Sequence, residues 1–595
     1  MNSFKEGIHS FKGYGKVAEA LDQRSLQEKA KTRKRVIIIC IASVVLVAIV
    51  ASVAVGIVRS KSSSNADTGS AAGESKTTSK AMKAVCDTTQ YQDTCISSLS
   101  SYPGASKASA KDLVDIAVVV ALSQAQKAFD LVSNLTTKSS DLYQKMALMD
   151  CLELMDETVD QLNSSNGELK KFDFKSLTDP AGDVRTWLSA ALTNLDTCVD
   201  GMANTTSNDA KAQIESIVEN LNQLTSNGLA IVKSISDVLG ILKIPFPTRR
   251  LLTDDFYPVE HGFPEWVSAA DRRLLQVNVT QADITVAKDK SGNYQTIQEA
   301  VDAAPEKSMK RYIIKVKAGI YEENVQISKK KTMLMIIGDG MDNTIVTGSK
   351  NVVDGTPTFS TATVAAVGMG FIARDIQFTN SAGASKHQAV ALRVGSDKSL
   401  FLRCKITAYQ DTLYAYSLRQ FYRDCYISGT VDFIFGNAAV VFQNCTIAVR
   451  VPNAGQKNTV TAQGRKDPNQ NTGISIHNCK ITGETDLNAV KSIYPSYLGR
   501  PWKMYSRTVI MLSQIDDIIN PAGWLEWDAD FALKTLYYAE YNNFGAGAAV
   551  NNRVKWPGYK VLTDENDAKP FTVGQFIGTS WLKTTEVAFT EGLTA

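Results

Sequence analysis

Histidines and closely paired cysteines are scarce in this 595-residue sequence. Its four histidines, at positions 9, 261, 387 and 477, are scattered along the chain. Histidine-rich metal chemistry is therefore not expected. The nine cysteines include no C-x-x-C pair, which argues against zinc ribbons and thioredoxin-type redox sites. We predict neither a metal ion nor a cofactor.

An excess of charge of one sign is also missing. The 64 Lys and Arg residues nearly balance the 61 Asp and Glu residues, which leaves a formal charge of +3. A dedicated nucleic-acid-binding protein usually carries a strong basic excess, so we expect no nucleic-acid partner. Hydrophobic residues make up 44% of the chain and charged residues 21%, a composition that can bury cores. The length predicts several domains.

Charged residues are absent from the run 36–58, which is 23 residues long. At 1.5 Å per residue, this run is long enough to cross a bilayer as a helix. Six basic residues lie between positions 24 and 35, whereas only Arg59 and Lys61 follow closely. The positive-inside rule predicts a cytosolic tail at 1–35, a signal-anchor helix at 36–58 and a lumenal remainder. A buried core helix is the alternative, but no polar face interrupts the run.

Two further features fit a protein of the secretory pathway. Residues 59–80 are rich in Ser, Ala, Gly, Thr and Lys and predict a flexible stalk. N-glycosylation sequons occur at Asn134, Asn163, Asn204, Asn278 and Asn444, of which the first four are our candidate glycosylation sites. Sequons are common by chance and support this interpretation only weakly.

Residues 81–243 follow a helical pattern. Apolar residues recur at steps of three and four at Ile214, Ile217, Leu221, Leu224, Ile231, Ile235 and Val238, with Gly228 at the missing position. Such stripes predict amphipathic helices that pack as a four-helix bundle. Cys86, Cys95, Cys151 and Cys198 also lie here and allow three disulfide pairings in an oxidising lumen. The local pairing, Cys86–Cys95 with Cys151–Cys198, is the simplest.

Residues 244–275 are a Pro-rich segment that contains the tetrapeptide Arg-Arg-Leu-Leu twice. The basic pairs are Arg249 with Arg250 and Arg272 with Arg273. Paired basic residues in such a linker are accessible to proteases. Two solvated charge pairs could arise by chance, but the repetition favours proteolytic processing by a protease of the secretory pathway.

From about 280, short β-branched and aromatic runs alternate with Gly, Asn and Asp turns. Four segments share a pattern that ends in Cys-x-Ile, with their cysteines at 404, 425, 445 and 479. The first three cysteines are 21 and 20 residues apart, a period that suits one coil of a parallel β-helix. A propeller blade would need about twice that length. The wider last gap predicts an inserted loop at 451–471.

Four polar residues repeat with the same period. Gln388 and Gln410 are 22 residues apart, and Asp411 and Asp432 are 21 apart. In a β-helix these side chains would stack on one face about 5 Å apart. Two carboxylates can divide the roles of nucleophile and general acid/base, and two amides can form an oxyanion hole. Turn caps or a solvent-facing ladder would give the same spacing.

Arg500 and Trp502 lie far along the chain in the segment LGRPW. An arginine can hold a carboxylate through two hydrogen bonds and favour its charged form, and a tryptophan can stack on a sugar. Aromatic residues are dense in the same region, at Tyr409, Tyr414, Phe433, Phe435, Tyr497, Trp524 and Trp527. A groove lined by aromatic residues and containing aspartates indicates carbohydrate processing. A surface cation–aromatic pair is the alternative.

Five segments, GIYEE (319–323), QAVALR (388–393), YQDTL (409–413), DFIFG (432–436) and LGRPW (498–502), resemble the plant pectin methylesterases. The resemblance covers roughly 280–595 and implies a right-handed parallel β-helix at 276–595. It also implies hydrolysis of methyl esters of homogalacturonan in the cell wall. No motif position is missing.

The resemblance implies a role for each matching residue. Asp432 would be the nucleophile, Asp411 the proton donor and acceptor, and Gln410 and Gln388 the stabilisers of the oxyanion. Thr358, Gln388, Arg500 and Trp502 would bind substrate. The family also implies a disulfide at Cys425–Cys445. Cys445–Cys479 is an alternative to it, and the two cannot coexist.

Residues 81–243 resemble the pectin methylesterase inhibitor domain, on the cysteine pattern and the helical stripes. The Arg-Arg-Leu-Leu tetrapeptides resemble the processing motifs of pectin methylesterases that carry such a pro-region. Together these resemblances imply a membrane-anchored precursor whose pro-region inhibits or retains it until cleavage releases the enzyme to the wall. Separate inhibitor proteins similar to the pro-domain are further expected partners.

Two other functions compete with this one. A depolymerising glycosidase or lyase could use the same fold and paired carboxylates. The second alternative is a non-catalytic protein that binds the wall or acts as an inhibitor. The presence of Asp411, Asp432 and Arg500 together weighs against it. A serine hydrolase is excluded because no G-x-S-x-G occurs. An aspartic protease is disfavoured because neither Asp411 nor Asp432 lies in a D-T/S-G turn.

Overall fold

The computed structural model describes residues 80–171, 180–203, 205, 208–241, 282–585 and 587–594. The expected tail, anchor and Arg-Arg-Leu-Leu linker lie outside the described residues, as do Asn204, Asn278 and nearly all of the stalk. The helical region up to residue 237 and the β-strand region belong to one compact unit.

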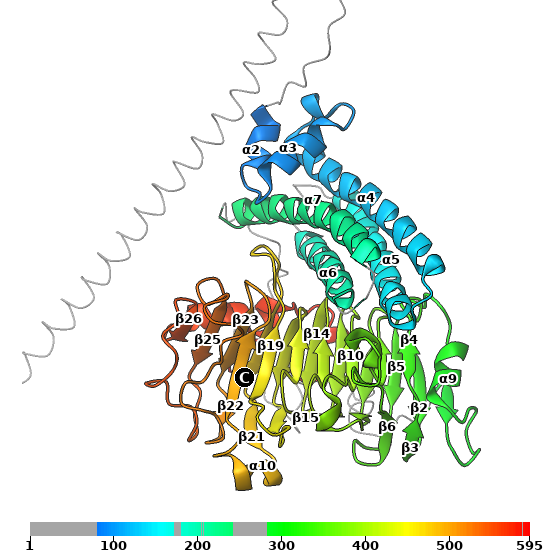
Figure 1. The fold of residues 1–595 in the computed structure, drawn as a ribbon, viewed down its shortest axis with the longest axis vertical. Helices are drawn as coiled ribbons and strands as arrows, with labels where there is room; N and C mark the ends of the chain where they lie inside the picture. The colour runs from blue at the N-terminus through cyan, green and yellow to red at the C-terminus, as the bar shows by residue number, and fades with distance from the viewer. Residues whose placement is uncertain are drawn as a thin grey trace, which may run out of the picture. The chain divides into compact units, whose positions relative to one another are not determined.

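The helical region contains four long helices, preceded by two short ones. These are α2 (Lys80–Cys86), α3 (Gln92–Ser100), α4 (Ala110–Lys138), α5 (Leu142–Lys171), α6 (Pro180–Gly201) and α7 (Asn208–Ile241) (Figure 1). Ser109 begins α4 with a capping box, in which its hydroxyl accepts from the Asp112 N–H. On α7, Ile214, Leu221 and Leu224 are buried, as their spacing predicts.

Two disulfides cross-link this bundle. Cys86 on α2 pairs with Cys95 on α3, and Cys151 on α5 pairs with Cys198 on α6. The local pairing expected from the sequence is therefore confirmed. The second bridge closes 47 residues, and a disulfide of this kind typically contributes about 2–4 kcal/mol by restricting the unfolded chain.

One helix among the described residues is long and apolar enough to span a membrane, and it is the segment Lys111–Lys138 within α4. Its side chains Leu113, Val118 and Val132 are buried inside the bundle. A core helix of a bundle meets the same criteria of length and composition. This segment is therefore only weak evidence for a membrane span.

The strand region is a parallel β-helix with three sheets (Figure 1). The first sheet contains eleven strands: β1 (Ile284–Val286), β2 (Tyr312–Val316), β5 (Leu334–Ile337), β8 (Ile372–Arg374), β11 (Ser399–Leu402), β14 (Arg419–Arg423), β17 (Ala439–Gln443), β20 (Gly473–His477), β23 (Arg507–Met511), β25 (Tyr537–Tyr541) and β26 (Tyr559–Leu562). The second contains β4 (Val325–Ile327), β7 (Val364–Ala366), β10 (Leu392–Val394), β13 (Leu413–Ala415), β16 (Ile434–Gly436), β19 (Asn458–Gln463) and β22 (Ser496–Pro501). The third contains β3 (Gly319–Glu322), β6 (Thr344–Gly348), β9 (Gln377–Asn380), β12 (Lys405–Thr407), β15 (Tyr426–Gly429), β18 (Thr446–Val449), β21 (Lys480–Gly483) and β24 (Gln514–Ile515).

The register of these strands matches the repeat in the sequence. Leu392 pairs with Leu413, and Leu413 pairs with Ile434, so each coil advances the chain by one repeat. The expectation of one loop at 451–471 is wrong, because β19 lies inside that range. The six residues of β19 are all buried, so this stretch is a coil strand with longer connections before and after it.

In the interior of the β-helix, side chains at equivalent positions of successive coils stack into columns. Phe401, Tyr422 and Phe442 stack with ring centroids 4.7 Å apart at each step. Short helices pack against the β-helix. They are α9 (Ile297–Ala303) beside β1, β2 and β4, α10 (Thr485–Val490) beside β21, and α11 (Glu565–Ala568) and α12 (Val573–Phe576) on the outer face of the first sheet.

The cysteines of the repeat form another buried column. Cys404, Cys425, Cys445 and Cys479 are all free thiols, so the implied disulfide Cys425–Cys445 is not formed in this structure. Backbone groups surround the thiols instead: the Cys425 Sγ lies 3.4 Å from the Phe401 carbonyl oxygen and 3.3 Å from that of Arg423, and either can accept its single proton. Burial also raises the pKa of the Cys425 thiol well above its usual value, which favours the protonated thiol over the reactive thiolate.

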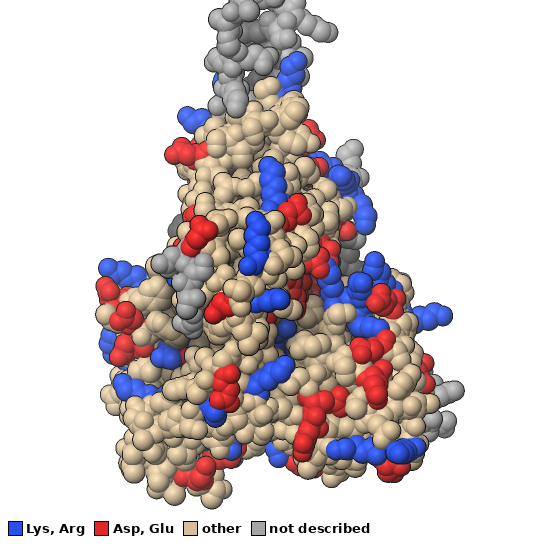
Figure 2. Space-filling model, turned by 45° about the vertical axis from the view of Figure 1, so that its right-hand side comes forward, with Lys and Arg blue, Asp and Glu red and all other residues tan. Residues whose placement is uncertain are grey.

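Basic and acidic side chains are interspersed on the surface, as Figure 2 shows for one face of the molecule. No large field of one sign covers this face, in agreement with the near balance of charge in the sequence.

Candidate active site

Three coils of the β-helix place the repeated polar residues together. Gln388 precedes β10, Gln410 and Asp411 precede β13, and Asp432 precedes β16. The Asp411 N–H donates to the Val431 carbonyl and the Ala389 N–H to the Gln410 carbonyl, which ties each coil to the next. Asp411 and Asp432 adopt left-handed backbone angles, with φ of 63° and 53°, a conformation that aspartate tolerates better than most residues.

Asp432 is paired with a cation. Arg500, on β22, donates from Nε to Asp432 Oδ1 at 2.8 Å and from Nη2 to Oδ2 at 2.7 Å. Such a two-point pair fixes the orientation of the carboxylate. Arg500 itself lies 4.4 Å from the centre of the Trp527 ring, within the range of a cation–π contact.

Asp411 has a different environment, although it lies one coil away. Burial first, and then the charge of Asp432, raise the pKa of Asp411 well above its usual value, against a smaller effect of Arg500. The two carboxyl groups therefore differ in the way that a nucleophile and a proton donor must differ.

Aromatic side chains line the floor beside the two aspartates. The rings of Tyr414 and Phe435 are stacked with centroids 4.1 Å apart, and the Trp502 ring lies 6.0 Å from Phe435. Trp502 packs closely on the backbone of Gly464, where an added Cβ would lie 2.8 Å from the indole. The Trp502 ring is tilted by 60° to the rings of both Tyr414 and Phe435, and the three side chains together give an apolar surface suited to a sugar ring.

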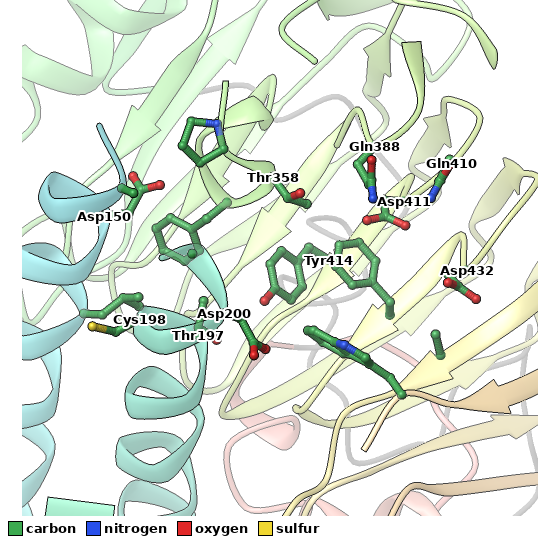
Figure 3. A pocket seen from close by; sticks show the side chains of 18 of the residues that line it. Asp150, Thr197, Cys198, Asp200, Thr358, Gln388, Gln410, Asp411, Tyr414 and Asp432 are labelled. Carbon is green, nitrogen blue, oxygen red and sulfur yellow. The ribbon is translucent and has the colours of Figure 1, made fainter. Parts of the chain in front are cut away.

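All seven candidate catalytic and substrate-binding residues line one cavity: Thr358, Gln388, Gln410, Asp411, Asp432, Arg500 and Trp502. Figure 3 shows Gln388, Gln410 and Asp411 close to one another, with Asp432 nearby, each just before one of three neighbouring strands. The amide oxygen of Gln410 is buried without a hydrogen-bond partner among the described residues, so no hydrogen bond to this oxygen fixes its position.

Residues of the helical bundle line the same cavity, which the sequence did not predict. They are Tyr143, Ala147, Asp150, Cys151 and Leu154 on α5, and Thr197, Cys198, Asp200 and Gly201 on α6. Figure 3 shows Asp150, Thr197, Cys198 and Asp200 on the helices that face the strands. Only contacts between distant parts of the chain, which no local pattern encodes, could have revealed them.

Ion pairs join the bundle to the β-helix, and the bundle contributes the acidic partner. Acidic residues of the bundle meet basic residues of the strand region at Asp200–Lys503 (2.8 Å), Asp196–Lys466 (2.7 Å), Asp156–Lys329 (2.7 Å) and Asp183–Arg419 (2.5 Å). The Tyr416 hydroxyl also donates to Asn194 Oδ1 at 2.7 Å, in a buried position. The bundle is thus held over the cavity by specific polar contacts.

Sequence reasoning missed one residue in direct contact with the predicted nucleophile. The Thr459 hydroxyl donates to Asp432 Oδ1 at 2.6 Å. The longer connections around β19 interrupt the 21-residue spacing that identified the other residues. The segment NTVTAQ, with its β-branched residues, is the signal that could have placed Thr459 on the next coil.

Family models match both parts of the chain. The pectinesterase model matches residues 283–580, and the plant invertase/pectin methylesterase inhibitor model matches residues 80–231. These matches, with the parallel β-helix, define a carboxylic ester hydrolase. The chain belongs to the pectinesterase family.

Relatives support this assignment over most of the length. Pectinesterase 3 of Citrus sinensis is 48% identical over 86% of this chain and 88% of its own. Pectinesterase/pectinesterase inhibitor U1 of Solanum lycopersicum is 46% identical over 95% of this chain and 97% of its own. The solved structure of pectin methylesterase from carrot is 61% identical, with a TM-score of 0.53, over 53% of this chain and 99% of that one.

Proposed function

We propose that the chain removes methyl groups from pectin by hydrolysing the C6 methyl esters of homogalacturonan. The single observation that carries the proposal is the pair Asp411 and Asp432 in one aromatic-lined cavity, with only Asp432 bound to Arg500. The products are methanol and free carboxylates. Pectinesterase relatives and the pectin methylesterase of carrot support the same reaction.

In the first half of the reaction, Asp432 is the nucleophile. Its ionised carboxylate attacks the ester carbonyl carbon, and the carbonyl oxygen becomes an oxyanion that the amides of Gln388 and Gln410 stabilise. The intermediate then collapses and expels the methoxy group. Asp411 protonates that group, so methanol leaves and an acyl-enzyme remains.

In the second half, Asp411 acts as the base. It takes a proton from a water molecule as the water attacks the acyl carbon, and the bond to Asp432 breaks. This returns Asp432 as a carboxylate and Asp411 as an acid. Thr358, Gln388, Arg500 and Trp502 bind the sugar, with Trp502 supplying the apolar surface.

The test is the set of products formed from methylated pectin. The region 276–595 is a suitable enzyme, because the carrot relative aligns over 99% of its chain with only about half of this one. We expect methanol without new reducing ends and without unsaturated ends. New chain ends would identify a depolymerising glycosidase or lyase instead, and no methanol at all would favour a binding protein without catalysis.

The bundle at 81–243 is proposed to be an inhibitory pro-region, linked through 244–275 to the catalytic region. Its support is the position of α5 and α6 residues in the cavity and the four ion pairs that hold them there. A polymer cannot lie along the strands while the helices occupy the same space. Methanol release by the full chain, compared with 276–595, tests this: equal rates would contradict inhibition.

The precursor is proposed to be a single-pass membrane protein, with 1–35 in the cytosol and 36–58 as the anchor. Support comes from the uncharged run and its basic flank. Asn134 and Asn163 are exposed on α4 and α5, so both could carry glycans together with Asn204 and Asn278. Protease digestion of intact microsomes tests the topology, because loss of the C-terminal region without detergent would contradict it.

A further inference from the structure

Thr459 lies opposite Asp432 on the next coil. Ile434 of β16 pairs with Thr461 of β19, and counting back two residues on each strand sets Thr459 beside Asp432. The Thr459 side chain is fully buried. The Asp432 carboxylate thus lies between Asp411 on the preceding coil and the Thr459 hydroxyl on the following coil.

The orientation of this hydroxyl is fixed by its partners. The Asp432 backbone N–H donates to Thr459 Oγ1 at 2.8 Å. A backbone N–H can only donate, so Thr459 Oγ1 accepts there and its own proton is directed to Asp432 Oδ1, 2.6 Å away. Thr459 therefore binds the backbone and the side chain of the same residue and restricts the rotation of the carboxylate.

The two oxygens of Asp432 are consequently unequal. Oδ1 accepts from the Thr459 hydroxyl and from Arg500 Nε, whereas Oδ2 accepts only from Arg500 Nη2. A carboxylate oxygen has about two lone-pair sites for hydrogen bonds. Both sites of Oδ1 are occupied, and Oδ2 retains one for a bond to carbon.

We infer that Thr459 is a positioning residue, which holds Asp432 so that Oδ2 is the atom that attacks the ester. This inference rests on the proposed function. A lone pair of Oδ2 forms the bond to the ester carbon while the carbonyl π electrons move to the oxyanion. When the bond to the methoxy oxygen breaks, that oxygen takes the Asp411 proton. Oδ2 is then the bridging oxygen of the acyl-enzyme, and Oδ1 its carbonyl oxygen, still bonded to Thr459.

The test is a comparison of three variants of the full chain, produced in plant cells and extracted as wall enzyme. Thr459→Val keeps the shape but removes the hydroxyl, and Thr459→Ser restores it. Thr461→Val is the matched control: Thr461 is also buried on β19, but its hydroxyl donates to the Leu498 carbonyl at 2.9 Å and does not touch Asp432. Methanol release gives kcat and KM, and thermal unfolding reports the fold.

We expect Thr459→Val to lower kcat roughly 10- to 100-fold, the effect of one hydrogen bond to a charged group, with KM within about twofold. Thr459→Ser should recover most of kcat, and Thr461→Val should keep it.

A folded Thr459→Val enzyme with wild-type kcat overturns the inference, as does a Thr459→Ser enzyme as impaired as Thr459→Val. A loss of kcat in Thr461→Val equal to that in Thr459→Val would reduce Thr459 to a structural role. The wild-type rate, measured alongside, separates the two proposals: a wild type that releases no methanol refutes the proposed function itself.

Discussion

Asp411 and Asp432 occupy the same position in successive coils, yet only Asp432 is bound by Arg500, through two hydrogen bonds of 2.8 and 2.7 Å. The repeat supplies two identical groups, and a residue 68 positions further along the chain makes them different. In the proposed mechanism, this asymmetry lets Asp432 attack while Asp411 holds a proton.

The pH profile should report the state of Asp411. Burial and the charge of Asp432 raise the pKa of Asp411, so its proton stays bound above the ordinary range of an aspartate. The proposed reaction uses that proton, so kcat/KM should fall as pH rises through the raised pKa of Asp411. Asp411→Asn should lose roughly 10²–10⁴ in kcat and lose this alkaline limb. An unchanged pH profile in a folded Asp411→Asn enzyme would remove Asp411 from the mechanism.

The amide side chains should matter to the rate more than to binding. Gln388→Ala and Gln410→Ala should each cost roughly 10²–10³ in kcat, the usual loss for one oxyanion donor. Both residues line the cavity instead of the apolar core, so circular dichroism should show intact folding. Steady-state methanol release is the measurement. A rise in KM with kcat unchanged would assign the amides to substrate binding alone.

The precursor should lose stability as pH rises. Burial raises the pKa of Asp150 to about 7, against a hydrogen bond from Ser360, and burial also raises the pKa of Glu157. Between the ordinary carboxyl pKa of about 4 and these raised values, the folded chain binds more protons than the unfolded chain. The stability is therefore fully present at acidic pH and is lost as pH rises through the raised pKa values.

Thermal unfolding of the full chain at several pH values checks this dependence. Asp150→Asn and Glu157→Gln should flatten the decline of Tm between pH 5 and 8. Asp130→Asn, which changes an exposed aspartate on α4, is the control and should leave the slope as in the wild type. Equal slopes in all four proteins would show that these buried carboxyls do not titrate in this range.

Processing should occur at the two Arg-Arg-Leu-Leu sites and leave a mature enzyme that begins near Gln276. Changing Arg249, Arg250, Arg272 and Arg273 to Ala should hold the precursor inside the cell. N-terminal sequencing of protein extracted from the wall is the direct check. A mature form that still begins before Arg249 would contradict the proposal.

The regular part of the molecule could be predicted from the sequence because the β-helix repeats itself. Cys404, Cys425 and Cys445 mark equivalent points of three coils, and Leu392, Leu413 and Ile434 pair in the structure with the same period. The stacking of Gln388, Gln410, Asp411 and Asp432 followed directly from that period. The bundle disulfides followed from sequence proximity and the compartment.

Other features depend on irregular or distant contacts. Thr459 escaped notice because the longer connection before β19 places it 27 residues after Asp432, outside the 21-residue spacing. Asp150 and Asp200 reach the cavity only through packing of helices on strands. The implied Cys425–Cys445 bond was taken from the family, whereas the structure shows four free thiols in one column, where Cys425 and Cys445 each have a cysteine on both sides.

The central claim is that Asp432 is the nucleophile, and methanol release by Asp432→Asn tests it most directly. Asp424→Asn is the matched control, since Asp424 also has a left-handed backbone, with φ of 54°, but does not line the cavity. Both variants should fold, as judged by circular dichroism. We predict that Asp432→Asn loses nearly all turnover while Asp424→Asn keeps it. A folded Asp432→Asn enzyme with near wild-type methanol release would contradict the account and favour direct attack by water.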